Sequence, residues 1–149
     1  MAQKQRVAVL IDAENVPAST ADRLFGEIAK LGKSKHRRLY GNLKKPQLKA
    51  WVSASQKHHI APRADAPHAK GKNVTDFTFV IDALDMLHTI NIDAFCIISR
   101  DSDFTGLAKY LREKGKRVYG LAGDQTPKCL RAQCDDLIEL KKPAQQKQL

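Results

Sequence analysis

Two apolar segments that are far apart in the sequence both end in carboxylates. VAVLID ends at Asp12, with Asn15 three residues later, and FCIIS is followed closely by Asp101 and Asp103. Both read as buried parallel strands, and ligands of parallel sheets bind where the carboxyl ends of such strands meet. Carboxylates held close together repel one another unless protons or a cation relieve them. The pattern therefore predicts a divalent-metal site, because Mg²⁺ takes hard oxygen ligands.

The same residues also have a structural interpretation, which the sequence leaves open. Asn15, two residues before Pro17, is typical of a helix start. One of Asp101 and Asp103 can cap the helix that follows them. Arg100, between the strand and these acids, could offset their charge in the absence of metal.

A third segment, GKNVTDFTFVIDALDML, places further carboxylates at the start of a predicted helix. Asn73 and Asp76 are spaced as in a capping box, and Asp76 could also point into the acidic site from the first turn. Asp82 lies about 120° further round the helix. We therefore rank Asp82 below Asp76, as a supporting residue, and expect Asp85 to be solvated.

Basic residues are concentrated in one part of the chain. Residues 30–72 hold twelve Lys or Arg and one acid, whereas residues 73–103 hold six Asp and one Arg. A basic surface beside an acidic pocket suits a polyanion, although such residues can also serve only solubility. If the polyanion is a nucleic acid, we expect phosphate contacts from Lys44, Lys45, Arg63, Lys70 and Lys72. Trp51 and Tyr40 flank this region and could stack on bases, although a core position fits them better.

Strand-like and helix-like segments alternate along the chain, which predicts an α/β fold with a mainly parallel sheet. We expect strands at residues 6–12, 37–40, 59–62, 94–99, 117–121 and 136–140. We expect helices at residues 18–31, 47–57, 74–90, 103–114 and 127–133. Gly32 should end the first helix, and residues 63–72 should form a mobile loop.

Length and composition fit one globular domain, expected at residues 1–140, with a disordered tail at 141–149. The chain has 149 residues, of which 42% are hydrophobic. No apolar run approaches the roughly 20 residues that span a membrane, and no secretory signal is recognisable, so we expect a cytoplasmic protein. The three cysteines form no CxxC pair, which argues against a zinc site or a disulfide framework.

Four sequence blocks, in this order, resemble the NYN domain, a PIN-like nuclease family that includes the LabA-like proteins. The blocks are VLIDAENV, GKNVTDFTFVIDALDML, CIISRDSDFTGLAKYLREKGKRVYG and TPKCLRAQCDDLIEL. The resemblance implies a PIN-like, Rossmann-type three-layer α/β/α fold with a mainly parallel sheet of five or six strands. It also implies a ribonuclease that uses Mg²⁺ or Mn²⁺. The metal-binding and catalytic residues that it implies are Asp12, Asp76, Asp101 and Asp103, with Asn15 and Asp82 in support.

The main hypothesis is a metal-dependent endoribonuclease that cleaves the phosphodiester bonds of single-stranded or structured RNA. One alternative is a non-catalytic RNA-binding NYN module. Another is a metal-dependent phosphohydrolase that acts on small phosphates, since a fold does not by itself determine function. DNA as a substrate, and pairing of the chain into a homodimer, are left open.

Overall fold

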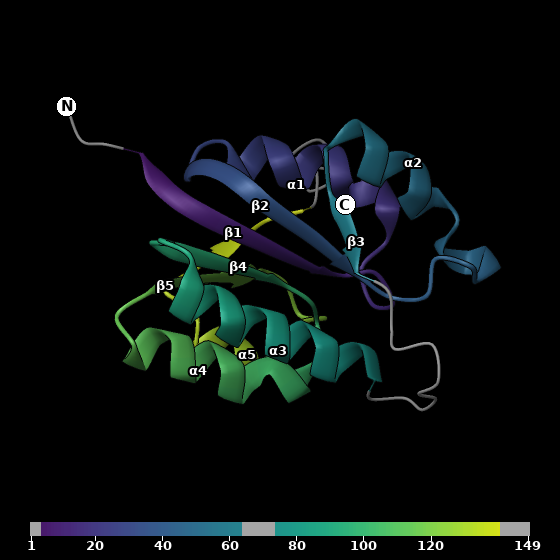
Figure 1. Ribbon diagram of the computed structural model, residues 1–149. Coiled ribbons are helices and arrows are strands. Elements are labelled where there is room, and N and C mark those ends of the chain that lie inside the picture. Colours follow the sequence, from purple (N-terminus) through teal and green to yellow (C-terminus); the bar gives the residue numbers. More distant parts are fainter. Residues whose placement is uncertain (1–3, 64–73, 141–149) are drawn as a thin grey trace, which may run out of the picture.

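The computed structural model describes residues 4–63 and 74–140. In this part of the chain, one sheet has the strand order β3-β2-β1-β4-β5-β6, and every neighbouring pair is parallel (Figure 1). The strands are β1 (Gln5–Asp12), β2 (Gly32–Tyr40), β3 (Ala61–Arg63), β4 (Ala94–Ile98), β5 (Arg117–Leu121) and β6 (Asp136–Ile138). The helices are α1 (Ala21–Ile28), α2 (Ala50–Lys57), α3 (Val74–Thr89), α4 (Thr105–Glu113) and α5 (Lys128–Ala132). The predicted α/β class is confirmed, with six parallel strands.

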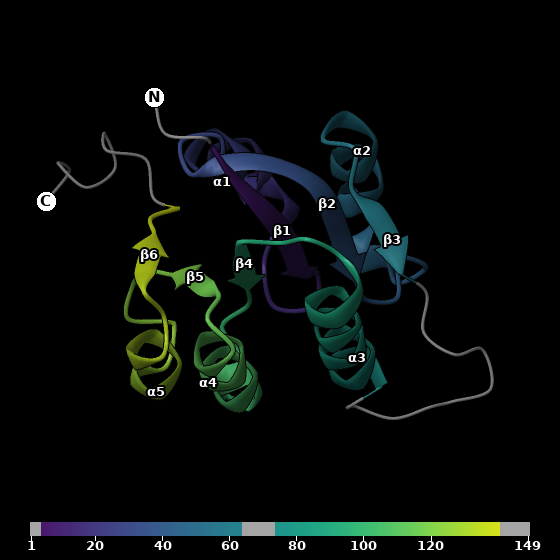
Figure 2. The same cartoon turned by 60° about the vertical axis from the view of Figure 1, so that its left-hand side comes forward.

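Helices cover both faces of the sheet, with α1 and α2 on one face and α3, α4 and α5 on the other (Figures 1 and 2). Alternate residues of β1 pack into the two layers: Val9 and Ile11 face α1 and α2, whereas Ala8 and Leu10 face the opposite helices. Burial on both faces explains why β1 and β4 read as continuous apolar runs. None of the helices described is long and apolar enough to cross a lipid bilayer.

Two aromatic side chains that were candidates for base stacking lie in the core instead. Trp51 is buried, and its Nε1 donates a hydrogen bond to the carbonyl of Val16 at 2.9 Å. Tyr40 is buried on the other face, where its ring centroid lies 4.9 Å from that of Phe79. These contacts hold α2 to the segment after β1 and α3 to β2, and the core interpretation of both residues is confirmed.

The first helix ends earlier, and the second strand begins earlier, than the sequence predicts. Helix α1 ends at Ile28, and Gly32 begins β2 rather than closing the helix. A Cβ on Gly32 would collide with the backbone carbonyl of Gln5 in β1, so this position needs glycine for close pairing. The first part of this strand was missed because residues 33–38 are polar and remain exposed or half-buried, which gives no apolar pattern.

The third strand is also shifted, to Ala61–Arg63 from the predicted 59–62. His59 has a φ of 54°, the left-handed conformation of a turn that follows α2. Arg63, predicted in the loop, pairs with Tyr40 of β2. The rest of the predicted mobile loop, the capping residue Asn73 and the tail at 141–149 lie outside the described residues.

The strand order places a topological switch point between β1 and β4. The chain passes from β1 to β2 on one side and later returns to β4 on the other. Ligands of such sheets bind outside the carboxyl ends of the strands at this point. Because Ile11 pairs with Ile98, the acidic segments that follow these two residues begin side by side.

We expect Gly32→Ala to lower the free energy of unfolding by about 1–3 kcal/mol, because the added methyl group meets backbone rather than a mobile side chain. Gly26→Ala, on the exposed side of α1, is the matched control. No atom lies within 4 Å of its added methyl group, so it should stabilise by up to about 1 kcal/mol. Urea denaturation measures both variants, and unchanged stability of the Gly32 variant would contradict the close contact.

Candidate metal centre

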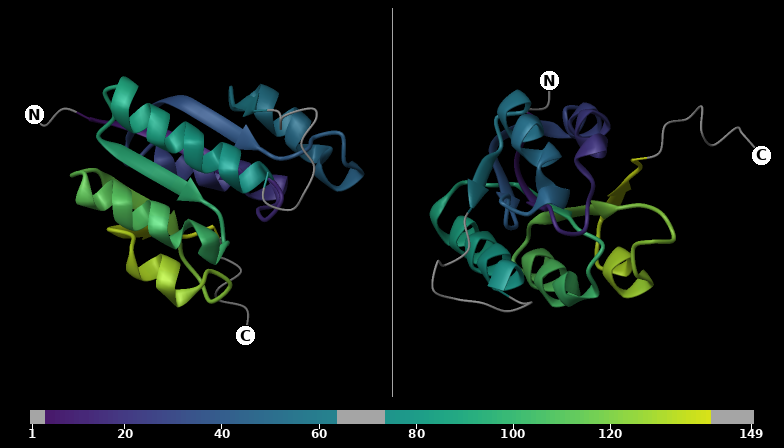
Figure 3. Two further views of the ribbon diagram at one scale, coloured as in Figure 1. Left: turned by 60° about the horizontal axis from the view of Figure 1, so that its bottom comes forward. Right: turned by 90° about the vertical axis from the view of Figure 1, so that its right-hand side faces the viewer.

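Three aspartates from three different elements converge at the carboxyl edge of the sheet. Asp12 ends β1, Asp76 lies in the first turn of α3, and Asp101 follows β4. Each offers one carboxylate oxygen, and the three oxygens lie within 4.8 Å of one another. The right-hand view of Figure 3 shows α3, which carries Asp76, beside α4, which follows the segment of Asp101, with both helices below the sheet. The structure thus brings together three of the four aspartates assigned to metal, and their role stays a prediction.

Asp12 is the most rigidly held member of the cluster. Its side chain is 1% exposed, and its Oδ2 accepts hydrogen bonds from Asn15 Nδ2 at 2.7 Å and from Ser99 Oγ at 2.8 Å. Its Oδ1 accepts from the backbone N–H of Glu14 at 3.2 Å. Burial raises the pKa of Asp12, the three hydrogen bonds oppose this rise, and the charge of Asp101 adds to it. Asn15 therefore acts through Asp12, which it orients.

Ser99 is a site residue that the sequence analysis did not identify. Its buried hydroxyl donates to Asp12 and accepts the backbone N–H of Asp101 at 3.1 Å. One hydroxyl therefore links the ends of β1 and β4. The signal in the sequence was weak, since it consists of one small polar residue at the end of an apolar strand.

Asp101 combines the two interpretations that the sequence left open. Its side chain caps the short 3₁₀ turn Ser102–Phe104, with Oδ1 accepting from the backbone N–H of Asp103 at 2.9 Å. It also belongs to the cluster of three carboxylates. Asp103 itself is exposed and lies outside that cluster, although its charge contributes to raising the pKa of Asp76.

Asp76 is the clustered aspartate whose pKa is raised by the charges of the most neighbouring carboxylates. Burial raises its pKa to about 6, helped by the charges of Asp101, Asp12 and Asp103 and by a hydrogen bond with Asp101. Within residues 4–63 and 74–140, no lysine or arginine forms an ion pair with any of the three clustered aspartates. A donor set made only of carboxylate oxygens with uncompensated charge fits a hard dication such as Mg²⁺ or Mn²⁺.

Arg100 does not neutralise these acids as expected. Its Nη1 donates to Thr126 Oγ1 at 2.8 Å and to the carbonyl of Ala122 at 3.3 Å. The guanidinium therefore ties the segment after β5 to the end of β4.

Asp82, predicted to support the acidic site, belongs to a different network. Its buried carboxylate accepts the hydroxyl of Tyr40 at 2.8 Å and pairs with Arg63 at 2.9 Å and Arg38 at 3.4 Å. These bonds tie α3 to β2 and β3. Arg63 thus shares its guanidinium with Asp82 while its side chain remains 48% exposed, and its contact with an RNA phosphate stays a prediction.

The other predicted phosphate contacts differ among themselves. Lys45 is exposed and pairs with Glu14 at 3.1 Å. Lys44 is exposed, and no ion pair with another described residue is found for its side chain. Lys70 and Lys72 lie outside the described residues.

We expect Asp76→Asn to stabilise the metal-free protein at neutral pH. A carboxyl whose pKa rises from 3.8 to about 6 on folding destabilises the folded state as the pH increases through that interval. The side chain is partly exposed, so solvent screening reduces the gain to about 1 kcal/mol. Thermal or urea unfolding in chelator should show this gain above pH 6 and none near pH 3. An equal gain at both pH values would contradict the repulsion described here.

The chain is similar to known proteins in fold and in family. A solved structure of a protein of unknown function from Vibrio parahaemolyticus is similar, with a TM-score of 0.73 and 15% sequence identity. The match covers 95% of this chain and 96% of that one, and at this identity it shows the fold alone. No curated protein matches the sequence at a significant level. The NYN domain matches residues 6–141, which is nearly the whole chain. The chain therefore belongs to the NYN domain family.

Proposed function

We propose that this protein is a metal-dependent endoribonuclease whose reaction takes place at Asp12, Asp76 and Asp101. The observation that carries the proposal is the convergence of these carboxylates, without a cationic partner among the described residues, at the switch point of the sheet. Membership of the NYN domain family, which has a nuclease-like fold, supports the same reaction class.

Each residue of the site has a distinct part in this proposal. Asp12, Asp76 and Asp101 would hold Mg²⁺ or Mn²⁺. Such an ion lowers the pKa of a bound water and stabilises the charge that develops on a phosphate. Asn15 and Ser99 fix the carboxylate of Asp12 by hydrogen bonds. Asp103, exposed beside the cluster, adds negative charge at its rim.

Two features favour RNA over small phosphates as the substrate. The formal net charge of the chain is +10, which suits a long polyanion. Phe77 follows Asp76 in the first turn of α3 and is 65% exposed, so its aromatic ring is accessible to a base. Unpaired bases stack on such faces, so the arrangement favours single-stranded segments or loops.

The direct test is incubation of RNA with the protein and Mg²⁺ or Mn²⁺, with and without chelator. We expect cleavage that chelator abolishes and that Asp101→Asn reduces by at least about a hundredfold, since metal stabilisation is worth several kcal/mol. The asparagine oxygen can still cap the turn at 102–104, so the variant should fold. Asp85→Asn, which removes an exposed charge from the same helix α3 that carries Asp76, is the control and should remain active.

Three outcomes would contradict the proposal. Cleavage that persists in chelator, or in the Asp101 variant, would exclude the metal cluster as the site. RNA binding without cleavage under either metal would identify a non-catalytic module. Preference for nucleoside monophosphates over RNA would identify a small-molecule phosphohydrolase.

We expect Phe77→Ala to reduce the cleavage of single-stranded RNA about tenfold, because stacking of a base on an aromatic ring contributes about 1–3 kcal/mol. Hydrolysis of a small phosphodiester without bases should be unchanged. Ile81→Ala is the matched control, because Ile81 is 64% exposed one turn further along α3. Equal loss with both substrates would mean that the substitution disturbs the site rather than base binding.

A further inference from the structure

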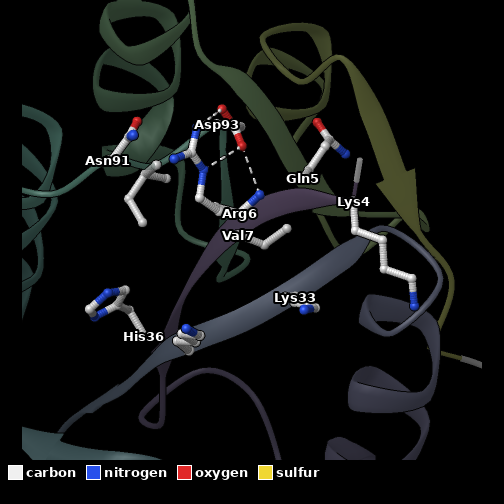
Figure 4. Close-up of a pocket in the computed structure, with 10 residues that line it drawn as sticks. Lys4, Gln5, Arg6, Val7, Lys33, His36, Asn91 and Asp93 are labelled. Atoms are coloured by element: carbon white, nitrogen blue, oxygen red, sulfur yellow. Dashed lines mark hydrogen bonds and ion pairs between the residues drawn. The ribbon is translucent and has the colours of Figure 1, made fainter. Parts of the chain in front are cut away.

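An open pocket of about 910 Å³ lies at the amino ends of the strands, whereas the acidic cluster lies at their carboxyl ends. It is formed by the amino ends of β1 and β2 and by the turn that precedes β4 (Figure 4). Its charged lining residues are Lys4, Arg6, Lys33, Lys35 and Asp93. We name this site the basic pocket.

The one acid among the described lining residues is fully used by one of the bases. Asp93 Oδ2 accepts Arg6 Nε at 3.1 Å and the backbone N–H of Arg6 at 2.8 Å, and Asp93 Oδ1 accepts Arg6 Nη2 at 3.1 Å (Figure 4). This pair fixes the wall of the pocket between β1 and the turn before β4. The charges of the three lysines are therefore not cancelled by Asp93.

Two lysines of this pocket have no ion-pair partner among the described residues, unlike several lysines elsewhere on the basic surface. Lys30, Lys45 and Lys57 pair with carboxylates at 2.7, 3.1 and 3.1 Å. Lys33 and Lys35 both lie on β2. By contrast, they make no ion pair or side-chain hydrogen bond with any other described residue. Lys33 and Lys35 thus place two free cationic groups at the amino end of β2, remote from the acidic cluster.

We propose that the basic pocket binds phosphates of the RNA strand that the acidic cluster cleaves. Strand β1 connects the two sites directly, since Arg6 borders the pocket and Asp12 belongs to the cluster. Six residues of extended chain separate them by about 20 Å. A strand that occupies both sites must therefore be several nucleotides longer than one that occupies the cluster alone. This inference rests on the proposed function in one respect: it assumes that the RNA bound at the basic pocket is the strand that the acidic cluster cleaves.

The lining also fits nucleic acid beyond the phosphates. Val7 and Ile92 form a buried apolar floor, and the side chains of Asn91 and His36 stand at the rim. An amide and an imidazole can hydrogen-bond base or sugar groups without selecting one sequence. The pocket therefore suits backbone-directed binding with little sequence preference.

The test compares Lys33→Ala/Lys35→Ala with Lys109→Ala/Lys128→Ala, which removes the same charge from the exposed sides of α4 and α5. RNA affinity is measured in chelator, so that no cleavage occurs, over a series of salt concentrations. For single-stranded RNA of about 20 nucleotides, the first variant should lower the slope of log K against log salt by about 1.4, or about 0.7 per phosphate contact. The control pair should leave the slope unchanged. With Mg²⁺ present, RNA of about 4 nucleotides, which can occupy the cluster alone, should be cleaved equally by both variants, whereas the longer RNA at low concentration should be cleaved more slowly by the first variant.

The outcomes separate this proposal from the endoribonuclease proposal. If the wild-type protein cleaves RNA but the two double variants have the same salt slope, the basic pocket is excluded while the nuclease stands. If the slope falls as expected but no RNA is cleaved with either metal, the pocket is supported and the nuclease is excluded. Equal loss of cleavage for short and long RNA in the Lys33/Lys35 variant, or no loss for either, would overturn the shared-strand inference.

Discussion

Mutual repulsion of three carboxylates is the constraint on which the arrangement of this protein depends. Asp12, Asp76 and Asp101 present oxygens within 4.8 Å of one another, and the pKa of Asp76 is raised to about 6 as a result of burial and this repulsion. The rest of the fold must supply the free energy that holds them together. It does so through a strand buried on both faces beneath Asp12 and through hydrogen bonds that fix the carboxylates of Asp12 and Asp101 before any ligand arrives.

Helix α3 shows how neighbouring acids acquire opposite roles from their partners. Asp82 is held by two arginines and a tyrosine hydroxyl, so its charge is matched and it joins the helix to β2 and β3. Asp76, less than two turns earlier, has no such partner among the described residues and faces two other carboxylates. The matched acid fixes the helix and thereby sets the position of the unmatched one. We infer that loss of the Asp82 network would displace Asp76 without touching it.

The sequence predicts the parts of this fold that depend on buried apolar runs. Burial on both faces made β1 and β4 recognisable, and the rule for parallel sheets then brought Asp12 and Asp101 together. The same approach found only the end of β2, because residues 33–38 are polar and lack apolar periodicity. It also missed Ser99 and the partners of Asp82, because a hydrogen bond across the sheet leaves no mark in local composition. Which acid is matched and which is not depends on three-dimensional pairing alone.

The separation of charge along β1 gives the two ends of the sheet different requirements for an anionic ligand. At the carboxyl end, three uncompensated aspartates repel phosphate, so an RNA strand can approach closely only when a dication reverses the local charge. At the amino end, Lys33 and Lys35 attract phosphate whether or not metal is present. If both proposals hold, RNA binds first through the basic pocket, and metal determines whether the same strand reaches the carboxylates. Binding and cleavage would then respond to different ions, with monovalent salt weakening the first and divalent metal permitting the second.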